Sequence, residues 1–424
     1  MRTLILLSTP LLAAAETHSL TLKQAVERAL QQNPELLLAR YDDVQAQLAV
    51  REARDPFLPK LVVGSGLAYS SGFPLSIEGS APSVVRADAS QTLFNRERSY
   101  QVAKVQEQAR GRGIDLQARR EEVIFQVAQT WVDALRLERV LEAARQQAES
   151  ADRLAMVVAA RVAEGRELAV EAKKMEAQRA QSRYRADALG QDLVFQQAQL
   201  AVLLGYPAAD RVQPLDTGEA NWPLPDDEAA AVSQALAANK ALKSLESRLQ
   251  VAGLDLKSAE AARLPKINLI AQYGLFARFN NFDQYFNRFT RNNGQLGVAF
   301  QIPLLVGSVA AARAAQSESE AARLRIEISR QRHRVALDTQ RSYQEVRLAE
   351  SFREVARLDL EAAREQVTVF LAQLAEGRAG IQQVESARQV ESDKWVAYLE
   401  AQSRLEKARL RLLRDTGGLL AALQ

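Results

Sequence analysis

The sequence Ala-Glu-Gly-Arg occurs twice, at residues 163–166 and at residues 375–378, each time inside a long stretch without proline. These proline-free stretches, 83–206 and 304–424, are rich in Ala, Arg, Glu, Gln and Leu, which are strong helix formers. A glycine that follows a helical run commonly ends the helix. We therefore expect each stretch to fold as two long antiparallel helices joined by a tight turn at the Ala-Glu-Gly-Arg sequence.

The two turns belong to an internal repeat. The sequence Leu-Pro-Lys at 58–60 recurs at 264–266, so the chain carries two kinds of landmark in the same order. Similar landmarks in the same order indicate duplication more strongly than a shared Ala- and Glu-rich composition does. We therefore expect two copies of one unit, residues 16–208 and residues 209–424.

Each copy is expected to contain a helix, a β-hairpin, a long helix, the tip turn and a shorter helix. The hairpins span 58–94 and 264–305. The expected helices are 20–55, 97–163 and 168–204 in the first copy and 226–263, 309–375 and 380–415 in the second. Thr21 and Asp226 are the expected N-caps of the first helix of each copy. A helix of 67 residues, such as 97–163, is roughly 100 Å long and needs parallel helices to cover its apolar face.

Composition excludes several kinds of chemistry. The 424 residues carry 55 Lys and Arg against 52 Asp and Glu, a net charge of +3, which argues against a nucleic-acid partner. There is no cysteine, so disulfides, thiolate nucleophiles, Cys-ligated zinc and N-terminal lipid attachment to Cys are excluded. No phosphate-binding glycine loop or metalloprotease motif occurs. We expect no catalytic residue, no cofactor and no metal site.

The N-terminus resembles a secretory signal peptide. Arg2 supplies the positive charge, Leu4–Leu12 form a short apolar core, and Ala13–Ala15 fit the small-residue cleavage pattern. We expect residues 1–15 to be removed by cleavage after Ala15. The alternative is a buried N-terminal helix. No later segment has about 18 consecutive apolar residues, the length that a transmembrane helix needs.

The two hairpin segments alternate in polarity with a period of two. In the second hairpin, the apolar residues Ile267, Leu269 and Ala271 alternate with the polar residues Asn268 and Gln272. This pattern fits a transmembrane β-barrel and also fits a half-buried soluble sheet. The export signal favours the barrel. Because four strands cannot close a barrel, closure requires several chains: two chains give eight strands and three give twelve.

Several of these landmarks together resemble the TolC family of outer-membrane efflux proteins. They are the opening LTLKQAVERALQQNPEL at residues 20–36, the Leu-Pro-Lys before each hairpin, the strand exits QTLF at 91–94 and IPLL at 302–305, and the two glycine turns. The resemblance covers essentially the whole mature chain. It implies a mainly α fold with a membrane β-barrel portion, in which a homotrimer forms a twelve-stranded barrel and a periplasmic α-helical tunnel.

The resemblance also implies function and location. The chain would be a passive exit duct in the outer membrane of a Gram-negative-type bacterium, with a large periplasmic portion and contact with outer-membrane lipid. It would work in a tripartite efflux or type I secretion system with a periplasmic adaptor and an inner-membrane pump of the RND, ABC or MFS type. Drugs, metal ions and proteins all remain open as cargo. A periplasmic adaptor (membrane fusion) protein and a structural coiled-coil protein are the alternatives, which the duplication and the strands disfavour.

The resemblance assigns residues to two sites near the tips. The residues expected to dock the adaptor are Gly165, Arg166, Leu168, Gly377, Arg378 and Ile381. In the family, acidic side chains just after the turns narrow the closed tunnel, and the matching positions here are Glu171, Gln383 and Glu385. Because Gln383 is not acidic, one acidic layer is missing. Leu168 and Ile381 would otherwise continue the helical seam, and Glu171 would otherwise belong to a solvated helix face.

Overall fold

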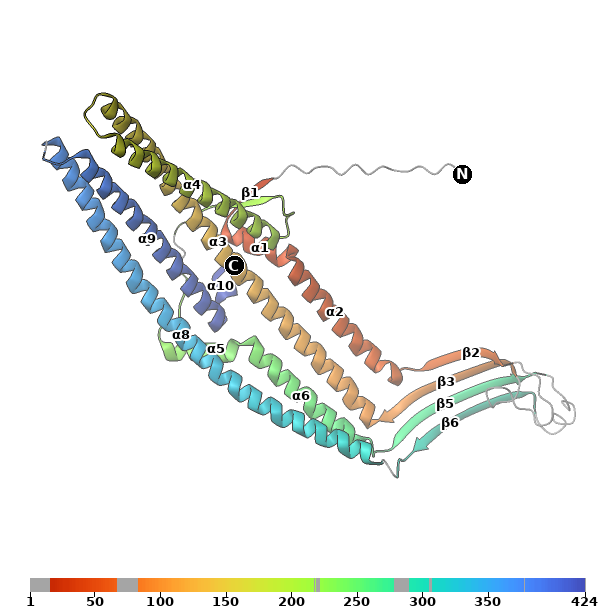
Figure 1. Cartoon of the computed structure of the whole chain (residues 1–424). Helices are drawn as coiled ribbons and strands as arrows, with labels where there is room; N and C mark the ends of the chain where they lie inside the picture. Colours follow the sequence, from red (N-terminus) through yellow and green to blue (C-terminus); the bar gives the residue numbers. More distant parts are fainter. Residues whose placement is uncertain are drawn as a thin grey trace, which may run out of the picture. The chain divides into compact units, whose positions relative to one another are not determined.

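The computed structural model describes residues 16–66, 83–216, 218, 222–277, 290–304, 307–376 and 378–423 of a mainly helical chain (Figure 1). The strands are β1 (Thr17–Leu20), β2 (Lys60–Gly66), β3 (Ser83–Asn95), β4 (Arg211–Pro214), β5 (Lys266–Phe276) and β6 (Asn292–Gln301). The helices are α1 (Leu22–Gln32), α2 (Pro34–Arg54), the 3₁₀ helix η1 (Asp55–Phe57), α3 (Arg96–Ala163), α4 (Ala169–Leu203), α5 (Glu228–Ala238), α6 (Lys240–Ala261), α8 (Gly307–Ala375), α9 (Ile381–Thr416) and α10 (Leu419–Leu423). Among the described residues, no helix combines the length and the apolar character needed to cross a membrane. The expected signal peptide, residues 1–15, lies outside the described residues.

The chain divides into two compact units. One unit holds the residues up to Ala39, Leu116–Lys240 and the chain from Arg332 onward, and the other holds Arg40–Asp115 and Ala241–Gln331. Each unit therefore combines segments from both halves of the sequence. The long helices α3 and α8 each contribute residues to both units.

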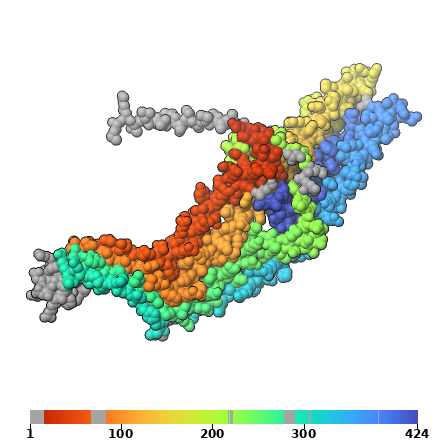
Figure 2. Space-filling view, turned by 180° about the vertical axis from the view of Figure 1, so that it is seen from behind, coloured from red at the N-terminus to blue at the C-terminus, as the bar shows by residue number. Residues whose placement is uncertain are grey.

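The second unit contains a four-stranded antiparallel sheet in the order β2-β3-β5-β6, and Figure 2 shows β2 and β3 beside β5 and β6. The strand register places side chains of similar polarity in the same row across the sheet. One row across the sheet is entirely apolar, namely Leu61, Ala89, Ala271 and Leu296. The next row is mainly polar, namely Val62, Asp88, Gln272 and Gln295. Since adjacent rows point to opposite faces, the sheet has an apolar face and a polar face, as the alternation predicted.

The helix predicted over 20–55 is wrong in one respect, because it is broken into α1 and α2 at Asn33. Asn33 has φ −61° and ψ 125°, an extended conformation that the following Pro34 favours. The Asn33 amide holds the break in place. Its Oδ1 accepts a hydrogen bond from the Leu36 N–H at 3.1 Å, and its Nδ2 donates to the Leu203 carbonyl at 2.8 Å.

The helix predicted over 226–263 is broken in the same way, into α5 and α6. Asn239 leaves the helical conformation, with φ −57° and ψ 116°, and its N–H donates to the Ala235 carbonyl at 2.9 Å. The following residue is Lys240 rather than proline. The second break therefore lacks the sequence signal that Pro34 supplies in the first copy.

One of the two predicted N-caps is confirmed and the other is wrong by one residue. The Thr21 hydroxyl accepts a hydrogen bond from the Gln24 N–H, and the Gln24 side chain accepts one from the Thr21 N–H, which makes a complete capping box. In the second copy the N-cap is Asp227, whose Oδ1 accepts from the Ala230 N–H at 2.6 Å, and not Asp226.

The main hydrophobic core lies in the first unit, where α1, α3, α4 and α9 meet. Its buried side chains include Val26, Ile124, Trp131, Leu200 and Leu413. Two short elements that the sequence did not predict border this core, the parallel pair β1–β4 and the helix α10.

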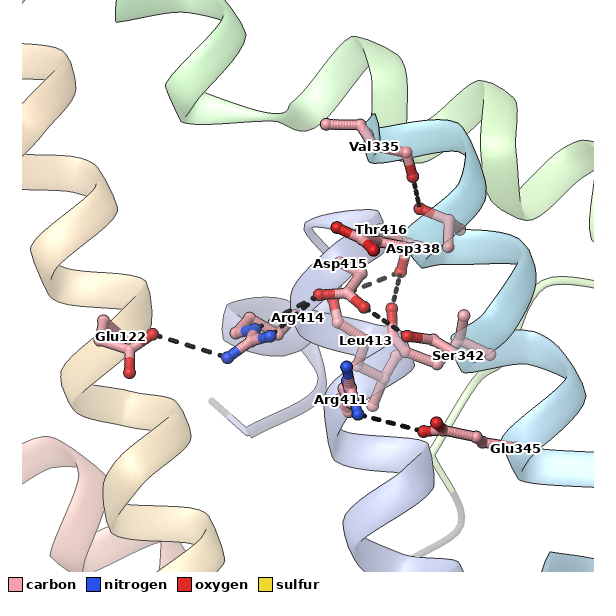
Figure 3. Close-up of polar contacts among 12 residues, drawn as sticks. Glu122, Val335, Asp338, Ser342, Glu345, Arg411, Leu413, Arg414, Asp415 and Thr416 are labelled. Carbon is pink, nitrogen blue, oxygen red and sulfur yellow. Dashed lines mark hydrogen bonds and ion pairs between the residues drawn. The ribbon is translucent and has the colours of Figure 1, made fainter. Parts of the chain in front are cut away.

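Polar contacts fix α9 to its neighbours beside this core (Figure 3). The Ser342 hydroxyl of α8 donates to Asp415 at 2.6 Å, Arg411 pairs with Glu345 of α8 at 3.1 Å, and Arg414 pairs with Glu122 of α3 at 3.7 Å. Ser342 is almost fully buried. The end of α9 that lies far from its tip is therefore held by both apolar packing and partly buried polar contacts.

Candidate functional site

The first tip joins α3 to α4 through residues 164–168. Gly165 has φ +69°, its N–H donates to the Val162 carbonyl at 3.0 Å, and the Arg166 N–H donates to the Arg161 carbonyl at 2.8 Å. This is the Schellman arrangement, in which a left-handed residue ends the helix. A Cβ added to Gly165 would meet no atom within 4 Å, so the backbone conformation, and not crowding, requires glycine here.

The second tip closes α8 in a similar way. The Arg378 N–H donates to the Gln373 carbonyl at 2.8 Å, which is the same six-residue link that closes α3. Gly377 lies outside the described residues, so its predicted role stays a prediction. Ile381 is the first residue of α9.

Each tip carries the same exposed ion pair. Arg166 lies 3.2 Å from Glu164, and Arg378 lies 3.2 Å from Glu376. The arginine side chains are 77% and 78% exposed. Because exposed pairs of this kind contribute little to stability, both guanidinium groups are available to a partner.

Apolar side chains are also exposed near the first tip. Leu168, the N-cap residue of α4, is 70% exposed and makes no side-chain cap. Val170 on α4 and Met156 and Val157 on the last turns of α3 are exposed as well. Leu168 therefore does not lie buried in a helical seam in the isolated chain.

The two glutamates predicted near the tunnel aperture have similar surroundings. Glu171 pairs with Lys174 at 2.8 Å, and Glu385 pairs with Arg388 at 3.6 Å, one helical turn further on in each case. Both carboxylates are only 24% exposed. Each carboxylate charge is thus partly neutralised by a neighbouring base on its own helix.

Gln383 has a structural role that the sequence analysis missed. Its Oε1 accepts a hydrogen bond from the Gly380 N–H at 3.0 Å, and its own N–H donates to the Gly380 carbonyl at 3.1 Å. The side chain therefore caps the start of α9 in the way that Glu or Gln does at the third helical position. The spacing Gly-x-x-Gln ahead of a helix was the available signal.

The two helical hairpins lie side by side, with both tips at one end of the first unit (Figures 1 and 2). Polar contacts join them near this end. Gln147 of α3 donates a hydrogen bond to Gln389 of α9, and Arg185 of α4 lies 3.7 Å from Asp393 of α9. Glu385 lines the groove that these four helices form.

The family model for outer membrane efflux proteins matches the chain twice, over residues 25–206 and 231–422. The chain belongs to this family. The resemblance on which the fold was predicted is thereby confirmed, as is the internal duplication. The chain is an outer-membrane efflux channel, and members of its family are channels rather than enzymes.

Solved structures of outer-membrane channels share the fold. The outer membrane protein VceC of Vibrio cholerae is 17% identical, with a TM-score of 0.76 over 94% of this chain and 96% of that chain. The CmeC channel of Campylobacter jejuni is 14% identical, with a TM-score of 0.78 over 94% and 86%. The MtrE channel of Neisseria gonorrhoeae, in its open state, is 15% identical, with a TM-score of 0.74 over 94% and 89%. No curated protein matches the sequence significantly.

Metal-binding groups are not brought together in the part of the chain that the structure describes. No three His, Asp or Glu side chains converge there in a way that would hold a metal ion.

The described tips present backbone turns, exposed arginines and, at the first tip, exposed apolar side chains. Such surfaces suit contact with another protein.

Proposed function

We propose that three copies of the mature chain form a passive exit duct in the outer membrane of a Gram-negative-type bacterium. A periplasmic adaptor would dock on its helical tips, and an inner-membrane pump of the RND, ABC or MFS type would supply the energy. The cargo would be small molecules or proteins. The observation that carries this proposal is the double match to the outer membrane efflux family along almost the whole chain.

The sheet supports assembly into a closed barrel. Within the described residues, β2 and β6 are the edge strands of the sheet, and each has one side without a partner. An unpaired edge is a ready template for a strand of another chain. Three sheets joined edge to edge give twelve strands, enough to enclose a channel.

The two faces of the sheet suit lipid outside and water inside. The apolar face carries rows such as Leu61 with Leu296, which suit contact with lipid. On the polar face, Arg86 and Asp88 form an ion pair at 2.7 Å. In a barrel, that face would line the lumen.

Exposed apolar stripes on the helices support association with further copies of the chain. Ile326, Leu337 and Leu348 recur along α8 at intervals of three helical turns, so they lie on one side of it, and they are 72%, 65% and 61% exposed. On α2, a second stripe of exposed residues consists of Leu38, Tyr41, Val44 and Leu48. Apolar stripes of this length are costly in water, and neighbouring protomers would cover them.

The assignment of the tip residues forms part of the proposal. Gly165, Arg166, Leu168, Gly377, Arg378 and Ile381 would contact the adaptor, while Glu171 and Glu385 would line the aperture, with Gln383 beside them. The exposure of Arg166, Arg378 and Leu168 supports docking. Opening would then be a shift of population toward a state in which the tips have separated.

Fractionation and transport together test this function. Cells that lack the gene should accumulate a fluorescent pump substrate, and expression of the intact chain should restore its export. The protein should be found with outer-membrane vesicles. Recovery from the soluble periplasmic fraction, with unchanged export, would instead favour a structural coiled-coil protein.

A further inference from the structure

We propose that the buried carboxylate of Asp210 binds the α-ammonium group that signal-peptide cleavage creates at Glu16. The inference rests on the proposed cleavage after Ala15. It concerns the position of that cleavage and the group that receives the new N-terminus.

The geometry already places the two groups together. The backbone nitrogen of Glu16 lies 3.2 Å from Oδ1 of Asp210, across 194 residues of sequence. Asp210 is only 7% exposed. Thr17 follows Glu16 in the sequence, Arg211 follows Asp210, and these two residues pair in the parallel β1–β4 ladder. The Arg211 N–H donates a hydrogen bond to the Glu16 carbonyl at 2.9 Å. The start of β1 is therefore held beside the carboxylate by the β1–β4 pairing.

In the part of the chain that the structure describes, Asp210 has no permanently charged partner. Its Oδ2 lies 3.5 Å from Nε2 of His18, which is charged only when protonated. The ring of His18 stacks on the ring of Tyr206, with the two centroids 4.1 Å apart. The guanidinium carbon of Arg28 lies 3.7 Å from the centroid of the same Tyr206 ring. Among the described residues, no lysine or arginine side chain pairs with Asp210.

Cleavage would supply the missing charge. A buried carboxylate is costly unless it is paired and hydrogen-bonded. In the precursor, Glu16 offers one neutral peptide N–H, whereas in the mature chain it offers a full positive charge and three donors. The ion pair forms only if the mature chain begins at Glu16, because one extra residue would move the charge away from Asp210.

The first test is the N-terminal sequence and intact mass of the protein purified from outer membranes. The proposal requires Glu16 as the first residue. A different first residue would overturn it and would leave the channel assignment unaffected.

The second test measures how fast an acylating reagent labels the α-amine at neutral pH. Pairing with a carboxylate keeps an amine protonated and unreactive, so the native protein should be labelled roughly tenfold more slowly than Asp210→Asn. Asp227→Asn is the matched control, because asparagine caps a helix as well as aspartate does. It should be labelled at the native rate. Equal rates for the native protein and Asp210→Asn would contradict the proposal.

A second variant keeps the test decisive if Asp210→Asn does not fold. Insertion of Gly-Ser between Ala15 and Glu16 leaves Asp210 and both strands intact but moves the α-ammonium two residues away. Its labelling should be as fast as that of a free N-terminal amine. Labelling as slow as in the native protein would show that Asp210 does not protect the amine.

Discussion

The side-chain Oε1 of Gln383 accepts a hydrogen bond from the backbone N–H of Gly380 at 3.0 Å. This contact gives the side chain a capping role at a position where the family resemblance implies an acidic residue. Glutamine caps the first turn of α9 without adding a charge next to Glu385. The first turn of α9 is therefore stabilised by a side-chain cap at this position.

Substitution of Gln383 separates capping from charge. Gln383→Ala removes the acceptor and should lower the free energy of unfolding by about 0.5–1 kcal/mol, as loss of a helix cap does. Gln383→Glu keeps the acceptor and places a negative charge at the helix N-terminus, so it should be neutral or slightly stabilising. Thermal unfolding followed by circular dichroism measures both. Destabilisation by Glu but not by Ala would contradict the capping role.

Substitution of Gly165 at the first tip should reduce export without preventing assembly of the oligomer. Gly165→Trp places a large side chain where the structure leaves open space, so it should reduce transport by obstructing the adaptor while the oligomer still forms. Gly165→Asn is the control for strain, because asparagine tolerates a positive φ. Dye efflux and native gels report the two properties. Normal export by Gly165→Trp would refute docking at this turn.

Two other glycines should be far less tolerant. Gly205 and Gly417 both have φ +77°, and an added Cβ would lie 2.5 Å from the Gln32 carbonyl oxygen and 2.5 Å from the Ala238 Cβ, respectively. Gly205→Ala should lower the free energy of unfolding by about 2–4 kcal/mol, since overpacking adds to backbone strain. Gly165→Ala should lower the free energy of unfolding by only about 1–2 kcal/mol, because backbone strain is the sole penalty where no neighbouring atom lies close. Equal losses in a denaturant titration would show that the close approach is unimportant.

The pH dependence of stability should include a contribution from Asp216. The Gly218 N–H, which donates to Asp216 at 3.0 Å, and the Arg139 guanidinium hold the pKa of this carboxyl below its usual range. A group whose pKa is lower in the folded state stabilises the fold above its unfolded pKa, and this stabilisation disappears as the pH falls through the folded pKa. Native protein should therefore exceed Asp216→Asn in stability at neutral pH, and the difference should shrink below about pH 4. A difference that grows in acid would have the wrong sign.

Neutralising Asp88 and neutralising Arg86, both on the polar face of the sheet, should change the ion selectivity of the channel in opposite directions. Asp88→Asn removes a negative charge from this face and should shift the ion selectivity of the channel toward anions. Arg86→Gln should shift it toward cations. Reversal potentials across a salt gradient in planar bilayers measure the shift. A shift of the same sign in both variants would mean that this pair does not face the conducting pore.

The long helices were predictable because each has local signals at both ends. The absence of proline and the glycine stops predicted helices at 97–163 and 309–375, and α3 and α8 begin one or two residues earlier and end where expected. The break at Asn33 was visible in Pro34 but was overlooked. The break at Asn239 has no such signal, because only its similarity to the first copy points to it.

Other features depend on distant partners and were not predictable. Strands β1 and β4 have four residues each, and each is an extended strand only because the other lies beside it, more than 190 residues away in the sequence. The tip turns at Gly165 and Arg378 follow from local backbone chemistry. Their exposure to the proposed adaptor would depend on the proposed trimer, which no short motif encodes.

The native mass of the mature protein, extracted in detergent from outer-membrane vesicles, tests the central claim most directly. Three copies would supply the twelve strands of the proposed barrel, so a homotrimer is the predicted result. A stable monomer would leave both edges of the sheet unpaired and would contradict the account of the chain as a closed outer-membrane duct.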